Sequence, residues 1–177
     1  MKNLLYISIL TLTFSFGFSQ ETPQEVNETS IVKLYQKAPE FSFQTADKKT
    51  ITTSDYKDKI ILVNFFATWC EPCMKEMPYL QKEVWNKLKD NPNFVLLSFG
   101  RDHSQEEIDK FIEKKKYSFP IYADKGKLVY NQFASKYIPR NYLIDRNGTV
   151  IYTSFGFTTE EFDKLKKVLS ELLKTQL

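Results

Sequence analysis

The chain has 177 residues, which is enough for one domain and a tail but too few for two domains of ordinary size. Hydrophobic residues make up 42% of it and aromatic residues 15%, which is ample for a packed core. The formal net charge of +3 is too weak to indicate binding to nucleic acid or to an anionic membrane, so we expect neither partner.

Residues 1–19 have the layout of a secretory signal peptide. A basic start precedes an apolar run from Leu4 to Phe18, and the small residues Gly17 and Ser19 predict cleavage after Ser19. The run is shorter than the ~20 residues that a membrane-spanning helix prefers, although an uncleaved anchor is the alternative. We therefore expect the rest of the chain to work outside the cytoplasm, in the periplasm or at the outer face of the cytoplasmic membrane.

The following segments predict a flexible leader and then a hairpin. Residues 20–32 are mostly polar and show no apolar periodicity, which is typical of a flexible segment. Alternation over Lys37–Phe43 and a short β-branched run at Thr50–Thr52 predict two strands, paired across the turn at Asp47–Lys49.

The centre of the chain combines a strand, a cysteine pair and a helix. Ile60–Phe66 is an apolar run interrupted only by Asn64, which predicts a strand buried on both faces. A helix is expected after it, because apolar residues recur with a period near 3.6 (Met77, Leu80, Val84 and Leu88).

Between the strand and the helix lie Cys70 and Cys73, the only cysteines of the chain. Two cysteines three residues apart in the first helical turn are side by side, and the helix N-terminus favours a thiolate. Pro72 suits that turn, because the N–H that it lacks would be unpaired there. This pattern favours thiol–disulfide exchange, with Cys70 as the exposed nucleophile and Cys73 as the resolving thiol.

The cysteine pair could also serve two other purposes. A structural disulfide closing so short a loop would remove little entropy from the unfolded chain. A zinc site would need four ligands, and the sequence has no second cysteine pair and one histidine, His103, which we expect in a surface loop. We expect no metal and no cofactor.

The second half of the chain predicts alternating strands and helices. Strands are expected at Phe94–Phe99 and Phe119–Tyr122, and helices after the capping box at Ser104 and over Lys127–Phe133. The pair Asn147-Gly148 predicts a hairpin, and a last helix begins after Thr158. This order predicts an α/β fold with a central mixed sheet and helices on both faces.

The segment around the cysteines resembles the active-site stretch of thioredoxin-fold proteins. Its Trp-Cys-x-Pro-Cys core is highly specific for that superfamily, and the flanking Glu-Pro and Glu-x-Pro indicate the TlpA/ResA type of thiol–disulfide oxidoreductase. The resemblance implies one thioredoxin-like domain over residues 33–177, with the N-terminal hairpin. It also implies a strand–helix insertion between Gly100 and a cis-proline at Pro139.

The resemblance also implies roles for residues near the cysteines. Glu76 would accept the proton of Cys73, whereas helix periodicity alone leaves it equally well a surface glutamate. Ile138 and cis-Pro139 would present backbone to a substrate peptide. Trp69, packed beside the site as a lid, and Pro72 would contact the same substrate. Arg140-Asn141 stands where many relatives have two threonines, so Arg140 is expected to change the polarity of the groove and to favour acidic partners.

The function that follows is a monomeric, extracytoplasmic reductase of protein disulfides, regenerated by a membrane-bound thiol donor. Its partners in some relatives include apocytochrome c. A thiol peroxidase is an alternative, because Ala38-Pro39-x-Phe41 also opens peroxiredoxins, but the Pro-x-x-x-Thr-x-x-Cys motif is missing. A non-catalytic module that binds a partner at Ile138-Pro139 is a third possibility.

Overall fold

The computed structural model describes residues 23–174, so the expected signal peptide and its cleavage site lie outside the described residues. Within residues 23–174, no helix is both long enough and apolar enough to span a bilayer.

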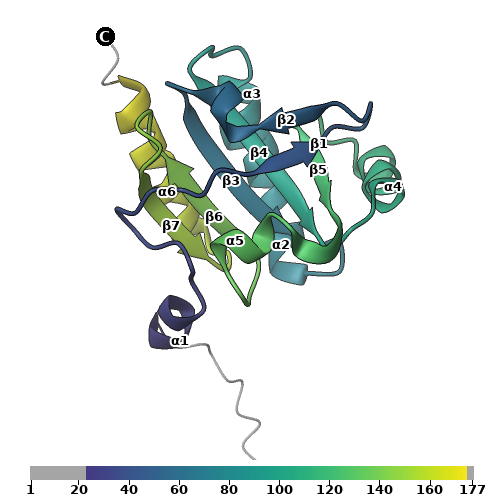
Figure 1. The fold of residues 1–177 in the computed structure, drawn as a ribbon, viewed down its shortest axis with the longest axis horizontal. Helices are drawn as coiled ribbons and strands as arrows, with labels where there is room; N and C mark the ends of the chain where they lie inside the picture. The colour runs from purple at the N-terminus through teal and green to yellow at the C-terminus, as the bar shows by residue number, and fades with distance from the viewer. Residues whose placement is uncertain (1–22, 175–177) are drawn as a thin grey trace, which may run out of the picture.

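The described chain is an α/β fold whose elements follow the predicted order (Figure 1). Its strands are β1 (Ser42–Gln44), β2 (Thr50–Thr52), β3 (Ile60–Phe66), β4 (Phe94–Arg101), β5 (Ile121–Asp124), β6 (Arg140–Ile144) and β7 (Val150–Phe155). Its α-helices are α1 (Pro23–Glu28), α2 (Glu71–Tyr79), α3 (Asn86–Leu88), α4 (Gln105–Lys115), α5 (Tyr130–Phe133) and α6 (Thr159–Lys174).

Five strands form the central sheet in the order β5-β4-β3-β6-β7. β3 pairs with β4, and β4 with β5, in parallel, whereas β6 is antiparallel to both β3 and β7. The expected hairpin of β1 and β2 forms a separate sheet. The predicted thioredoxin fold, with a mixed sheet, an N-terminal hairpin and an inserted strand and helix, is confirmed.

The two faces of β3 bury two separate cores, because successive side chains of a strand point in opposite directions. Ile60, Leu62 and Phe66 pack with residues of α2, α4 and α6. Ile61, Val63 and Phe65 pack with β1 and α5 on the other face. The largely apolar sequence of β3 is therefore explained by burial on both sides.

The helix after the cysteines is less regular than its periodicity predicts. It runs from α2 through a π-helical segment, η2 (Leu80–Trp85), into α3. Pro78 lies inside α2 and has no N–H to donate to the preceding turn, which is a usual cause of such an irregularity. The helix continues nonetheless and keeps Met77, Leu80 and Val84 in the core.

The prediction of a flexible leader over residues 20–32 is wrong for the described part of that segment. α1 is followed by Thr29–Val32, in which Thr29 and Val32 are buried. The backbone N–H groups of Ile31 and Val32 both donate to the carbonyl of Phe133, at 2.9 and 3.1 Å. This segment therefore packs along the chain that leaves α5.

The helix expected over Lys127–Phe133 is also shorter than predicted. A 3₁₀ turn, η3 (Lys125–Lys127), comes first, and α5 covers only four residues. Gly126 and Lys127 adopt φ values of 74° and 60°, in the left-handed region, so regular helix begins only after them.

Candidate active site

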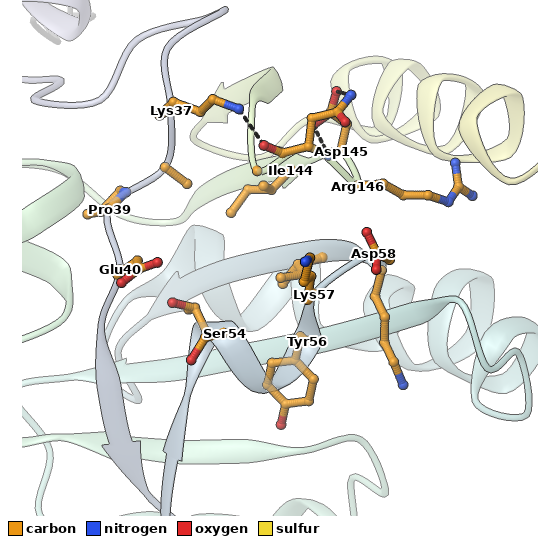
Figure 2. Close-up of a pocket in the computed structure, with 16 residues that line it drawn as sticks. Lys37, Pro39, Glu40, Ser54, Tyr56, Lys57, Asp58, Ile144, Asp145 and Arg146 are labelled. Atoms are coloured by element: carbon orange, nitrogen blue, oxygen red, sulfur yellow. Dashed lines mark hydrogen bonds between the residues drawn. The ribbon is translucent and has the colours of Figure 1, made fainter.

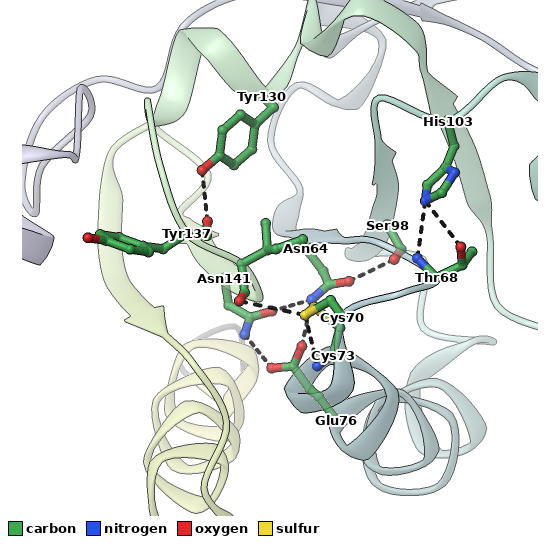
Figure 3. Close-up of a disulfide and its surroundings, with 11 residues drawn as sticks. Asn64, Thr68, Cys70, Cys73, Glu76, Ser98, His103, Tyr130, Tyr137 and Asn141 are labelled. Atoms are coloured by element: carbon green, nitrogen blue, oxygen red, sulfur yellow. Dashed lines mark hydrogen bonds between the residues drawn. A yellow bond between two sulfur atoms is a disulfide. The ribbon is translucent and has the colours of Figure 1, made fainter. Parts of the chain in front are cut away.

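The two cysteines are joined at the start of α2 (Figure 3). Their sulfurs are 2.08 Å apart and their Cα atoms 5.3 Å apart, so the predicted Cys70–Cys73 disulfide is present. Cys70 is the N-cap residue of α2, and its sulfur accepts the backbone N–H of Cys73 at 3.3 Å. The cysteine sulfurs therefore lie where the positive end of the helix dipole favours a thiolate.

The two sulfur-bearing side chains differ in access to solvent. Cys73 is fully buried, whereas Cys70 is 6% exposed, less than the sequence analysis expects for a nucleophile. Cys70 is still the outer of the two, because Cys73 lies one turn further into the helix. Of the two cysteines, only Cys70 has any exposure to solvent.

The peptide bond between Ile138 and Pro139 is cis, as the resemblance implies. It lies just before β6, and the carbonyl oxygen of Ile138 is 3.7 Å from the sulfur of Cys70. The carbonyl of Pro139 accepts the N–H of Gly156 at 2.9 Å. The loop containing this bond is therefore held directly opposite the cysteines.

Trp69 lies at the surface of the protein, next to Cys70. Its side chain is 70% exposed, so it is not a half-buried core aromatic. An exposed tryptophan next to Cys70 presents a large apolar surface to an incoming protein, as does its exposed neighbour in the motif, Pro72.

Glu76 is buried, with an exposure of only 1%, so the alternative of a surface glutamate is excluded. One carboxylate oxygen accepts the side-chain amide of Asn64 at 2.9 Å, and the other accepts that of Asn141 at 2.6 Å. Burial raises the pKa of Glu76 from 4.5 to about 7, and these two hydrogen bonds partly oppose the increase. Figure 3 shows the carboxylate on the side of α2 that carries the disulfide.

The amides that hold Glu76 belong to a row of polar residues across the sheet. Asn64 of β3 is paired in register with Ser98 of β4 and with Asn141 of β6, which in turn is paired with Ser154 of β7. Ser98 donates to Asn64 at 2.7 Å, Asn64 donates to Asn141 at 2.9 Å, and Asn141 donates to Ser154 at 3.2 Å. We call these four residues the polar row.

Sequence reasoning missed the polar row as a functional feature. The amide of Asn64 cannot act as a base, and local sequence patterns assign no role to Ser98 or Asn141. The sequence nevertheless contains a sign of the polar row. Each of its residues is a polar position within or beside an apolar run, and strand pairing places these positions next to one another.

Arg140 does not line a substrate groove, and the prediction that it would favour acidic partners is wrong. Its side chain is 2% exposed. The guanidinium donates to the carbonyl of Lys136 at 2.9 Å and to the hydroxyls of Thr29 and Ser30, both at 2.7 Å. A guanidinium fully engaged with the protein is not available to a substrate.

His103 is not a surface residue either, because it is only 5% exposed. Its Nε2 accepts the backbone N–H of Thr68 at 3.1 Å, and its Nδ1 lies 3.7 Å from a carboxylate oxygen of Glu107. His103 thus supports the loop that leads to Cys70. Among residues 23–174, no group of three or more histidine, cysteine or acidic side chains is arranged to hold a metal ion.

A cavity of about 620 Å³ lies at the other end of the sheet from the disulfide (Figure 2). Its lining includes Ile61 and Ile144, which pair at the start of β3, and Lys37, which donates to the carbonyl of Asn147. It contains none of the predicted site residues, and we assign it no part in the chemistry of the cysteines.

Known proteins with a similar sequence share this chemistry. Residues 34–153 match the AhpC/TSA family. The thiol-disulfide oxidoreductase ResA of Bacillus cereus is 31% identical, over 94% of this chain and 98% of its own. The ResA protein of Oceanobacillus iheyensis is 28% identical, over 99% of this chain and 88% of its own.

Proteins of known structure are also similar to this chain. A protein of Bacteroides thetaiotaomicron, described as a candidate disulfide isomerase, superposes with a TM-score of 0.78 and 34% identity, over 82% of this chain and 93% of its own. StoA of Bacillus subtilis gives a TM-score of 0.58 and 26% identity, over 73% of this chain and 96% of its own. With its paired cysteines at a helix N-terminus opposite a cis-proline, the chain belongs to the AhpC/TSA family and, within it, is a thioredoxin-fold thiol–disulfide oxidoreductase of the TlpA/ResA type.

Proposed function

We propose that this oxidoreductase works in the reducing direction, converting disulfides of extracytoplasmic proteins to dithiols. The observation that carries the proposal is the buried carboxylate of Glu76, one helical turn beyond Cys73, with its pKa raised to about 7. A resolving thiol shielded from water needs such a proton acceptor nearby.

In the first step the thiolate of Cys70 attacks one sulfur of the partner's disulfide. A mixed disulfide forms on Cys70, and the other partner sulfur leaves as a thiolate and takes a proton from water. The backbone of Ile138 lies beside the attacking sulfur and is available to pair with the partner's extended chain.

In the second step Glu76 takes the proton of Cys73, and the resulting thiolate attacks the sulfur of Cys70. The Cys70–Cys73 disulfide forms, and the partner's second sulfur leaves as a thiolate. Two electrons have then passed from the protein to the partner. The proton on Glu76 is lost to solvent before the next cycle.

A thiol donor must reduce the Cys70–Cys73 disulfide again. We place the protein outside the cytoplasm on the strength of residues 1–19, with a membrane-bound dithiol protein as donor and a monomer as the working form. An oxidising compartment makes such a donor necessary, because thiols there do not stay reduced unaided.

The direction of the reaction is tested by the reduction potential of the Cys70–Cys73 couple. We expect a potential of roughly −200 to −270 mV, measured by equilibration with glutathione or a thioredoxin of known potential. A potential near about −120 mV, typical of strong oxidants, would contradict a reducing role.

The partner class is tested by trapping. The variant Cys73→Ser should keep partners bound to Cys70 as mixed disulfides that a reducing agent releases, because it lacks the resolving thiol. Cys70→Ser is the matched control and should trap nothing. Equal trapping by both variants would show that Cys73 can also attack a partner's disulfide, which contradicts the assignment of Cys70 as the sole attacking thiol.

Two further results would favour the alternative functions. Full biological activity of Cys70→Ser would favour a binding module. Fast consumption of hydrogen peroxide by the reduced wild type would favour a peroxidase.

A further inference from the structure

The residue after the cis-proline is a buried arginine whose contacts all lie within the protein. Arg140 donates through Nε to the carbonyl of Lys136 and through its two terminal nitrogens to Ser30 and Thr29. It thereby connects both ends of the loop 136–140, in which the cis bond lies, to the segment that follows α1. Burying a guanidinium is costly unless its donors are satisfied, and here three of them have close partners.

The segment after α1 follows the same loop with its backbone. Ser30 forms a β-bridge with Ala134, and the N–H of Ser135 donates to the carbonyl of Thr29 at 2.9 Å. The contacts of Arg140 with Ser30 and Thr29 join positions that are 110 and 111 residues apart in the sequence. Residues 23–32, which we call the N-terminal arm, are therefore built into the side of the active-site loop.

A second connection holds Tyr137, the residue that precedes Ile138. The hydroxyl of Tyr137 donates to the carboxylate of Glu25 in α1. The backbone carbonyl of Tyr137 accepts the hydroxyl of Tyr130 at 2.7 Å (Figure 3). Tyr137 has a φ of 69°, in the left-handed region that side chains other than glycine rarely adopt. Such a conformation persists only where the surroundings hold it.

We propose that Arg140 is a positioning residue for disulfide exchange and that the N-terminal arm is a working part of the active site. Together they fix the loop so that the Ile138 backbone, 3.7 Å from the sulfur of Cys70, is already arranged to pair with an extended polypeptide. This inference rests on the proposed function, because it specifies how that reaction recognises its substrates. The inference predicts two classes of substrate. Reduction of a disulfide within a peptide depends on the N-terminal arm, whereas reduction of a small disulfide does not.

The test compares these two substrate classes with the same reduced protein. One substrate is a short peptide with a disulfide between two cysteines, and the other is a small aromatic disulfide, dithionitrobenzoate. In Arg140→Gln we expect the KM for the peptide to rise about tenfold, as it would if the loop held its binding conformation a tenth of the time. The kcat for the peptide and the rate with the aromatic disulfide should stay within twofold of wild type, because neither depends on pairing with the Ile138 backbone.

A second variant keeps the test decisive if Arg140→Gln does not fold. Thr29→Val/Ser30→Ala leaves Arg140 in place and removes two of its partners, so it should raise the KM for the peptide in the same selective way. Ile144→Val, at the far end of β6, is the control for lost stability alone and should leave the ratio of the two substrates unchanged.

Three results would overturn the inference: an unchanged KM for the peptide in both Arg140→Gln and Thr29→Val/Ser30→Ala, an equal loss with both substrates, or the same selective loss in Ile144→Val. Failure of the proposed function is a different result. It would appear in the wild type, as reaction with the aromatic disulfide but no reduction of the peptide.

Discussion

Replacing Glu76 by glutamine should change how the stability of the oxidised protein depends on pH. Burial raises the pKa of this carboxyl from 4.5 to about 7, so between these values the folded protein holds a proton that the unfolded chain has released. Stability is therefore lost as the pH rises through this window, and the loss is complete above about pH 7. The difference between the two pKa values corresponds to about 3 kcal/mol.

The glutamine variant has no carboxyl to titrate at this position. The free energy of unfolding of the wild type should therefore fall by about 3 kcal/mol more than that of Glu76→Gln between about pH 4 and about pH 8. All other groups are common to both proteins and cancel. The new amide also meets the donors of Asn64 and Asn141, but that cost does not depend on pH and leaves the predicted difference intact.

The measurement is equilibrium unfolding in urea at a series of pH values, with the disulfide intact so that no thiol titrates. Glu71→Gln is the matched control, because Glu71 lies in the same helix but is exposed and paired with Lys75 at the surface. It should leave the pH dependence nearly unchanged. Parallel curves for the wild type and Glu76→Gln would refute the reasoning, since they would mean that Glu76 titrates with the same pKa in the folded and unfolded states.

Three further predictions concern the reaction and the packing around it. Glu76→Gln should slow the attack of Cys73 on a mixed disulfide by about 100-fold or more, as measured by stopped flow. The pH profile of that rate should also lose its inflection near pH 7. An unchanged pH profile would mean that another group takes the proton. Trp69→Ala should change the free energy of unfolding by less than about 0.5 kcal/mol, because the side chain is exposed. The same variant should lower kcat/KM for a protein disulfide several-fold. A large loss of stability would contradict the exposed position. Gly100→Ala would place a Cβ 2.4 Å from the Cδ1 atom of Ile108 and should destabilise the protein by about 1–3 kcal/mol in urea unfolding. Adding Ile108→Val, which removes that atom, should recover part of the loss, and a further loss would show that the contact is not the cause.

Much of the fold follows from local signals in the sequence. The apolar run of β3 needs no partner to be recognised, and the capping box at Ser104 correctly gives the start of α4. Asn147-Gly148 likewise forms the expected turn, with Gly148 at a φ of 74°. In each case a few neighbouring residues carry the whole signal.

The errors come from groups whose environment is set by distant residues. Arg140 and His103 are polar and lie in or next to loops, and sequence reasoning therefore places them at the surface. Their partners come from other parts of the chain: Arg140 meets Thr29 and Ser30, and His103 meets Thr68, 35 residues away. The expectation of a flexible segment over residues 20–32 fails for the same reason, since a polar segment without periodicity gives no sign of what it will pack against.

The candidate site contains residues that local sequence identifies and residues whose surroundings only the folded structure reveals. The cysteine pair and Pro72 identify themselves by spacing alone. For Glu76, helix periodicity leaves a buried and an exposed position equally open, and only the resemblance favours the buried one. Its pKa depends on burial and on Asn64 and Asn141, which come together only when β3 and β6 pair.

The polar row also has a consequence for how the strands find their alignment. Apolar strands such as β3 and β4 bury equally well in several registers, because one aliphatic side chain replaces another at little cost. A shift of β6 by a single residue would turn the amide of Asn141 to the opposite face of the sheet and leave Glu76 and Asn64 without it. The polar groups that hold the carboxylate of Glu76 thus also penalise misaligned sheets, so the native strand pairing and the site of the proposed proton acceptor form together.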